Sequence, residues 1–263
     1  MKKLSLVNPF GASLFYEDTV SSTMDVSRIL AERGEPHGTV IIADFQNAGR
    51  GRIGRTWTAH KGENLFFTIL LRYAGYAVMP KVLTLKTGLA VSLAIEDFVK
   101  NRGLSLRESV QVKWPNDIMI GSRKAVGILT EGNSGVVYIG IGVNLAQTQF
   151  PQALREKATS IALGCDEKSS NIRSEDRFPL LETILAELYQ IITVPDDDQW
   201  RTQLLDRLYM RNKPVRFIPG PPDSTVSIEG VLRGIGPQGE LLIVLEGETK
   251  PVSCIAGELD VYR

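Results

Sequence analysis

A basic, glycine-rich segment between two apolar runs constrains the fold of this chain most strongly. It extends from Asp44 to Glu63, reads DFQNAGRGRIGRTWTAHKGE, and has no acidic residue between its two ends. Like charges repel, and each glycine raises the entropic cost of ordering the backbone. We therefore expect a loop that stays loose until a ligand orders it. The cations and the glycines among them are Arg50, Arg52, Arg55 and Lys61, with Gly49, Gly51 and Gly54.

Two predicted core strands flank this loop. GTVIIAD, residues 38–44, and NLFFTILLR, residues 64–72, are short and apolar, as buried strands are. Binding groups often lie on loops that a rigid frame holds. Glycine lets backbone N–H groups converge on phosphate oxygens, and arginine adds a planar, permanently charged fork. The residues favour a phosphate-binding loop; a solvated basic turn and an Arg/Gly segment that binds RNA are left open.

The composition limits the class of protein. The 263 residues predict one or two domains, and 30 basic residues balance 30 acidic ones, so no overall field attracts nucleic acid or an anionic membrane. No apolar run reaches the length of a signal peptide at the N-terminus, or the roughly 18 residues of a membrane span elsewhere. Cys165 and Cys254 stand far apart, which favours free thiols over a disulfide. We expect a cytoplasmic protein.

Predicted strands and helices alternate up to residue 211. Ser22 or Thr23 can cap a helix that Gly34 ends. In the run VVYIGIGVN, Gly140 and Gly142 indicate that another group approaches the strand closely. Further helices are predicted at 84–100, 152–157, 178–192 and about 200–208, and further strands at 14–16, 110–113, 118–120, 124–130 and 136–144, with 145–174 otherwise irregular.

The composition changes at Asn212. From there the chain offers roughly five short strands, separated by turns, in roughly fifty residues. This pattern predicts a small β-barrel with a domain boundary near Arg211.

Four motifs, in this order and spacing, resemble those of biotin–protein ligases. They are GRGRIGRTW (49–57), KWPNDI (113–118), RKAVGIL (123–129) and GIGVN (140–144), and the Ser22-Thr23 pair fits the same family. The resemblance covers essentially the whole chain. It implies an α+β fold, in which a mixed β-sheet packs with helices as in class II aminoacyl-tRNA synthetases. It also implies a catalytic domain at 1–211 and an SH3-like barrel at 212–263.

The resemblance implies a two-step reaction in one site. The carboxylate of biotin attacks the α-phosphate of ATP, with Mg²⁺ present, to give biotinyl-5′-AMP and pyrophosphate. A lysine of a biotin carboxyl carrier protein then takes the biotinyl group. Because two anions must be brought together, cations are needed to neutralise both.

The resemblance also assigns residues to this reaction. Lys124 fits the biotin carboxylate, Gln46 with Ser22 and Thr23 fits the ureido ring, and Met24 departs from a polar family position but can contact ligand through its backbone. The biotin-binding set is Ser22, Thr23, Met24, Gln46, Arg50, Gly51, Arg52, Lys124 and Gly127. The ATP-binding set is Arg50, Arg52, Trp57, Asn116 and Asn144, and the catalytic set is Arg50, Arg52, Lys113 and Lys124.

Several points are left open by the sequence. Asp117 is a weak candidate for binding Mg²⁺ or accepting a proton from the acceptor lysine, and it can equally hold its own turn. Only 21 residues precede Ser22, too few for the winged helix-turn-helix of some relatives, so we expect no DNA binding. A lipoate–protein ligase and an RNA-binding protein are the alternative functions. A homodimer is neither indicated nor excluded.

Overall fold

The main sheet has eight strands in the order β1-β2-β3-β4-β8-β7-β6-β5. The computed structural model describes residues 1–57, 60–75, 82–133, 135–166, 171–193, 199–220 and 225–260. Strands β2 and β3 are parallel and the other neighbours antiparallel, so the sheet is mixed, as predicted. The strands are β1 (Lys2–Leu4), β2 (Leu14–Val20), β3 (Thr39–Gln46), β4 (Leu65–Arg72), β5 (Val110–Lys113), β6 (Asp117–Ile120), β7 (Arg123–Asn133) and β8 (Val136–Val143).

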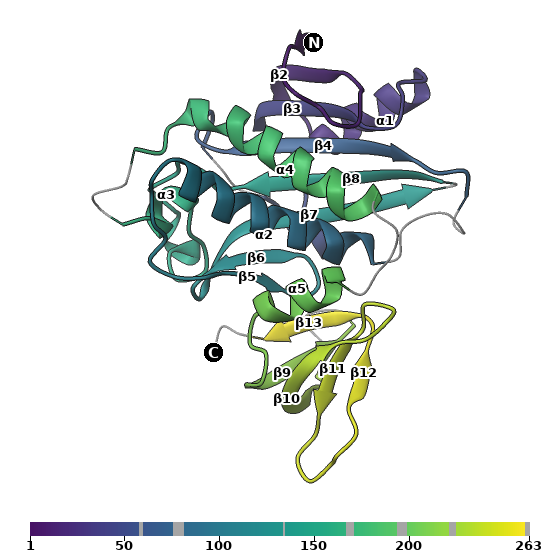
Figure 1. Ribbon diagram of the computed structural model, residues 1–263, viewed down its shortest axis with the longest axis vertical. Helices are drawn as coiled ribbons and strands as arrows, with labels where there is room; N and C mark the ends of the chain where they lie inside the picture. The colour runs from purple at the N-terminus through teal and green to yellow at the C-terminus, as the bar shows by residue number, and fades with distance from the viewer. Residues whose placement is uncertain are drawn as a thin grey trace.

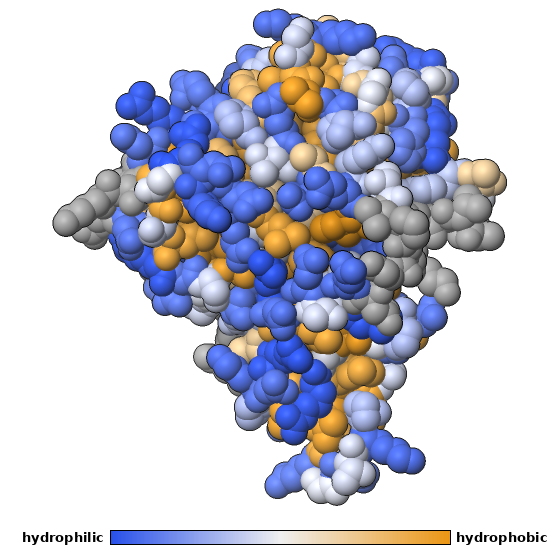
Figure 2. Space-filling view, in the orientation of Figure 1, coloured by the Kyte–Doolittle hydropathy of each residue, from blue (hydrophilic) through white to orange (hydrophobic). Residues whose placement is uncertain are grey.

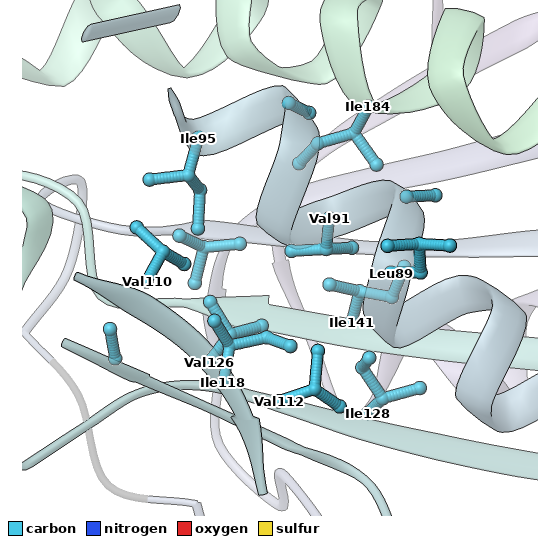
Figure 3. Packing of buried hydrophobic residues seen from close by; sticks show 14 of the residues in the cluster. Leu89, Val91, Ile95, Val110, Val112, Ile118, Val126, Ile128, Ile141 and Ile184 are labelled. Carbon is cyan, nitrogen blue, oxygen red and sulfur yellow. The ribbon is translucent and has the colours of Figure 1, made fainter. Parts of the chain in front are cut away.

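Helices cover one face of this sheet (Figure 1). The long apolar helix α2 packs against β5, β6 and β7, and α4 packs on α2. Figure 3 shows this contact with labelled side chains from α2, the sheet and α4: Leu89, Val91, Ile95, Val110, Val112, Ile118, Val126, Ile128, Ile141 and Ile184. The helices are α1 (Thr23–Glu32), α2 (Leu83–Asn101), α3 (Ile161–Gly164), α4 (Arg177–Thr193) and α5 (Gln199–Arg207), with 3-10 turns η1 (Arg52–Gly54), η3 (Gln152–Leu154) and η5 (Ser174–Asp176).

Alternation along the central strands gives the sheet two different faces. Leu65, Phe67 and Ile69 of β4 belong to the buried apolar cluster under α2. Thr68, between two of them, faces the other side, where it lies opposite Gly140 of β8. Helix α1 contacts β3, β4 and β8. Part of this glycine-bearing face therefore packs under α1, and the rest opens to a cavity.

A second, antiparallel sheet follows in the order β12-β11-β10-β9-β13. Its strands are β9 (Pro214–Pro219), β10 (Ile228–Ile235), β11 (Leu241–Val244), β12 (Val252–Cys254) and β13 (Gly257–Asp260). Helix α5 contacts both β5 and β10, and Figure 1 shows it between the two sheets. Trp114 ties the sheets together, since its Nε1 donates to Gly239 O at 2.8 Å and its ring packs on Phe217.

The predicted elements need few corrections. Strand β1 was not predicted, because its three residues are formed only by pairing with β2. The region 145–174 was expected to be irregular apart from a helix at 152–157; that helix is only a 3-10 turn, and α3 was missed. Residue Ser160 caps α3, and backbone bonds to Asn144 and Leu145 hold it, which are contacts that a local pattern does not reveal. The domain boundary at residue 211 remains a prediction.

The surface and the cysteines agree with the composition. Figure 2 shows a face that is mostly hydrophilic, with hydrophobic side chains in separate patches. Among the described helices, none combines the length and the apolar character that crossing a bilayer requires. Cys165 and Cys254 are both buried free thiols, and burial raises the pKa of each.

Candidate active site

A cavity of about 610 Å³ opens on the glycine-bearing face of the main sheet. Arg50, Arg52 and Lys124 all line it, so the cations of the basic loop and of β7 share one cleft. The other residues predicted to bind or react line it too: Ser22, Thr23, Met24, Gln46, Gly51, Trp57, Lys113, Asn116, Asp117, Gly127 and Asn144. The second sheet adds wall residues that the sequence analysis did not assign, namely Ile218, Glu258, Leu259 and Asp260.

Two glycines form the floor beneath Trp57. Gly127 of β7 and Gly142 of β8 lie opposite each other in the ladder. A Cβ atom on Gly127 would lie 2.5 Å from Trp57 Cζ3, and one on Gly142 would lie 3.1 Å from Trp57 Cε2. Real Cβ atoms do not approach ring carbons at the first distance. The pair of glycines is therefore what lets the indole lie against the sheet, as the close approach predicted at Gly142 requires.

Changing Gly127 to Ala should weaken ligand binding while leaving the fold intact. The added methyl group would clash with Trp57 and would lie 3.1 Å from Lys124 Nζ, so both side chains must move. We expect about a tenfold loss of affinity for biotin or ATP, the scale of losing one good polar contact. Calorimetric titration measures this loss. Gly234→Ala in β10 is the control, because Gly234 does not line the cavity and its methyl group would meet only the end of the Leu205 side chain; equal effects of both changes would contradict the steric argument.

The charged wall of the cavity has more cations than carboxylates at its centre. Lys124 Nζ lies 2.6 Å from Asp117 Oδ1 and 5.4 Å from the centre of the Trp57 ring. Lys113 is only 9% exposed. Burial lowers the pKa of Lys113, while the charge of Asp117 opposes that shift. Such an arrangement is suited to receiving an anion.

A preformed metal site is absent from the described part of the chain. These residues contain no group of three or more His, Cys, Asp or Glu side chains that could hold an ion. The carboxylate of Asp117 is already paired with Lys124. Mg²⁺ usually enters enzymes on substrate phosphates with one or two carboxylates. The donor set thus does not fit an ion held by protein alone, and Mg²⁺ remains a prediction.

The start of α1 supplies the polar end of the cavity. Ser22 is the N-cap, since its side chain accepts a bond from the backbone N–H of Met24. Thr23, the first helical residue, donates from both its N–H and its hydroxyl to Gln46 Oε1. Met24 is buried against Gly140, where an added Cβ would lie 2.8 Å from its sulfur. The close approach predicted at Gly140 is therefore made by a methionine side chain.

Two asparagines hold different parts of the cavity. Asn144 is 4% exposed and its Nδ2 donates to Thr159 O at 3.0 Å. Its Oδ1 has no hydrogen-bond partner among the described residues, so a ligand N–H group can use it. Asn116 Nδ2 donates to Ile128 O, and its Oδ1 accepts from Arg52 Nη1 at 3.0 Å. The structure thus gives Asn116 a contact with Arg52 that the prediction of ATP binding did not include.

Acidic residues from distant parts of the chain pair with the basic loop. Both Nη atoms of Arg50 donate to the carboxylate of Asp25, at 3.0 and 2.7 Å, and hydrogen bonding to Arg50 lowers the pKa of Asp25. Arg55 lies 2.7 Å from Glu258 on the second sheet. Lys61 lies 3.3 Å from Asp18. The expectation of a loose loop considered only charges within the segment, and these partners reduce that repulsion.

Ligand should still protect this loop from trypsin. The ion pairs are partly exposed to solvent, where such pairs contribute little stability. Cleavage after Arg50, Arg52 or Arg55 should therefore slow severalfold when biotin and ATP are both present. Timed digestion with mass spectrometry measures the rates, and cleavage after the exposed Arg102, which lies in a turn outside the cavity lining, is the internal control. Unchanged cleavage in the loop would count against ordering by ligand.

The comparisons with known proteins agree with this geometry. The model of the biotin/lipoate A/B protein ligase family matches residues 16–145. A biotin–[acetyl-CoA-carboxylase] ligase of Mycobacterium tuberculosis is 30% identical over 244 residues, which are 89% of this chain and 84% of that protein. The chain therefore belongs to the biotin–protein ligase family. The resemblance inferred from the four motifs is thereby confirmed.

One further relative is longer than this chain, and two others have solved structures with bound ligands. The bifunctional ligase/repressor BirA of Bacillus spizizenii is 36% identical over 165 residues, 60% of this chain, and the chain spans about half of that relative (49%). The biotin protein ligase of Aquifex aeolicus, solved with biotin and ATP, has 25% identity and a TM-score of 0.76 over 94% of this chain and 98% of its own. The Leishmania major enzyme with biotinyl-5-AMP has 25% identity and a TM-score of 0.63 over 92% and 98%.

Proposed function

We propose that this protein is an ATP-dependent ligase that makes biotinyl-5′-AMP and transfers biotin to a lysine of a biotin carboxyl carrier protein. One observation carries the proposal: Arg50, Arg52 and Lys124 line the same cavity as the polar cluster of Thr23 and Gln46. That cavity offers cations for two anions and fixed hydrogen-bonding groups for an uncharged ring. Relatives named as biotin ligases support the choice of substrate.

In the first step, the chain positions two negatively charged molecules. The ureido ring of biotin binds at Ser22, Thr23 and Gln46 on one side of the cavity. Lys124, on β7, receives the carboxylate; β4 and β8 separate that strand from β3, which carries Gln46. Three strand spacings of about 4.8 Å each allow a ligand as long as biotin to bridge the two ends.

The nucleotide lies on the side of the basic loop. Arg52, fixed by Asn116, neutralises the phosphate that biotin attacks, and Arg50 assists it once phosphate competes with Asp25. Asn144 Oδ1 accepts from the amino group of adenine, which supplies the donor that this buried oxygen needs. Trp57, whose indole lies against Gly127 and Gly142, walls the cavity beside Lys124 and keeps water from that side of the mixed anhydride.

In the second step, the neutral amine of the acceptor lysine attacks the acyl carbon and AMP leaves. Lys124 stays charged and stabilises the oxygen on which charge develops. Asp117 holds Lys124 at 2.6 Å, and this contact favours an orienting role for Asp117 over metal binding. Lys113, at the end of β5, adds a second cation to the same cavity, with β6 between its strand and β7. We further propose the domain division at residues 1–211 and 212–263, with the second sheet closing the cavity wall.

Labelled biotin, ATP and a biotin-accepting carrier domain test the proposal directly. We expect biotin-dependent pyrophosphate release and label on the carrier lysine, with lipoate inactive. Pyrophosphate release with lipoate instead would identify a lipoate ligase, the alternative within the same family. Release with neither acid, combined with RNA binding through the basic loop, would favour the RNA-binding alternative.

A further inference from the structure

A chain of three side chains runs from beneath the cavity to its polar end. Thr68 Oγ1 lies 2.8 Å from Thr23 Oγ1, which lies 3.1 Å from Gln46 Oε1. Thr68 is fully buried and Thr23 is 3% exposed. Thr68 does not line the cavity, and no motif in the sequence singles it out.

Simple chemistry fixes the direction of each bond in this chain. The backbone N–H of Thr23 lies 2.8 Å from the amide of Gln46, so the facing atom must be the carbonyl oxygen Oε1. That oxygen carries no hydrogen, so the hydroxyl of Thr23 must donate to it. The hydrogen of Thr23 is then used, and only Thr68 can donate in the remaining contact. The hydroxyl hydrogen of Thr68 therefore points to Thr23.

These directions decide what the cavity presents to a ligand. Gln46 Oε1 already takes two donors from Thr23, which leaves Nε2 of Gln46 as the group available for ligand. Hydrogen bonds in such a chain strengthen one another in a buried environment. Gln46 lines the cavity, and its Nε2 lies beside Gly49 at the start of the basic loop. The donor from Thr68 therefore helps to hold the Gln46 amide in this one orientation.

The strand beside Thr68 leaves space for this contact. Gly140 lies opposite Thr68 on β8 and lines the cavity. A Cβ atom there would lie 3.6 Å from Thr68 Oγ1 and 2.8 Å from the sulfur of Met24. A side chain at Gly140 would thus displace the end of the Met24 side chain, which follows Thr23 in α1.

We infer that Thr68 is a positioning residue that fixes the ligand-facing amide of Gln46 through Thr23. The inference rests on the proposed function, since it concerns the end of the cavity given to the ureido ring. Thr68 acts on binding and not on the chemical step, because the acyl group reacts at Lys124. Two strands, β4 and β8, separate β7, which carries Lys124, from β3, which carries Gln46. A fixed amide binds more tightly because less freedom is lost when the ligand arrives.

Kinetics of the variant Thr68→Val test the inference. Valine keeps the shape, suits a strand and removes the hydroxyl. We expect the KM for biotin to rise about fivefold to tenfold, as for one lost hydrogen bond. The kcat and the KM for ATP should stay within about twofold. Thr68→Ser restores the hydroxyl and should restore the KM. If the valine variant does not fold, Thr68→Ala also removes the hydroxyl and should raise the KM for biotin in the same way.

A second buried threonine gives a matched control. Thr39 of β3 is 1% exposed and donates to Pro36 O, away from the cavity lining. Thr39→Val should lower the melting temperature without changing the KM for biotin. An unchanged KM in Thr68→Val, an equal rise in Thr39→Val, or no rescue by serine would overturn the inference while wild-type activity stands. A wild-type protein inactive with biotin would overturn the proposed function, and this inference with it.

Discussion

Replacing Lys124 with Met should lower the rate of adenylate formation by about a hundredfold or more, because it removes a cation from the place where charge develops. Lys124 Nζ lies between the carboxylate of Asp117 and the face of Trp57. Methionine has nearly the same length and keeps the apolar contact with the ring, so the cavity wall should persist. Biotin-dependent release of pyrophosphate at saturating substrates measures the rate.

Two further variants separate catalysis from structural damage. Arg123→Met removes a cation from the preceding, exposed position of β7, which does not line the cavity, and should leave the rate nearly unchanged. Lys124→Met also leaves Asp117 without its partner, and an unpaired, largely buried carboxylate is costly. The double variant Lys124→Met/Asp117→Asn removes that cost. If it regained the wild-type rate, the loss would come from Asp117, and the chemistry would have to be assigned elsewhere.

The central strands could be predicted because each is a short run of apolar residues, which is visible in the sequence without knowledge of the strand's neighbours. Runs such as NLFFTILLR and VVYIGIGVN are short and nearly apolar throughout, which favours buried strands over helices, and β4 and β8 pair along their whole length. The close approach to β8 was predicted for the same reason, since Gly140 and Gly142 lie within an apolar strand where no turn requires a glycine. Only Met24 and Trp57, the groups that approach them, needed the structure to be found.

Partners far along the chain could not be predicted. Asp25 belongs to a capped helix and Glu258 to a small sheet, and nothing near either residue indicates a contact with Arg50 or Arg55. Thr68 is an ordinary strand residue by its type. Its importance comes from the alternation of β4, which turns its hydroxyl away from the core and toward Thr23. Such contacts depend on how strands and helices are assembled, which local patterns do not record.

The candidate site shows the same division. The motifs gave the residue types that the reaction needs, and the structure brings all of them to one cavity. The contribution of the second sheet was missed, because Ile218 and Glu258 lie in strands that look like part of a barrel. Asn116 was predicted to bind ATP from its place in the KWPNDI motif, and in the structure its side chain contacts Arg52. A role through a neighbouring side chain is therefore harder to infer than a direct one.

Replacing Arg52 with Ala should weaken retention of the adenylate by roughly 2–3 kcal/mol, the value of a hydrogen bond to a charged group in a largely desolvated site. This is a factor of about 30 to 150 in the dissociation constant. Asn116 holds one Nη atom of Arg52 and is itself held by Ile128 O, so the guanidinium is positioned before ligand binds. The rate at which labelled biotinyl-5′-AMP leaves the protein measures the loss.

A comparison with Arg52→Lys and Asn116→Ala shows whether fork geometry or charge is responsible. Lysine keeps the charge but lacks the planar fork, so Arg52→Lys should recover only part of the retention. Asn116→Ala leaves Arg52 charged but no longer fixed, and should lose less than Arg52→Ala. If Asn116 acts only through Arg52, the double variant should retain the adenylate as poorly as Arg52→Ala alone, because the two changes remove one interaction. Fully additive losses would mean that Asn116 contacts the nucleotide directly, and normal retention in Arg52→Ala would refute the phosphate-binding role of the loop.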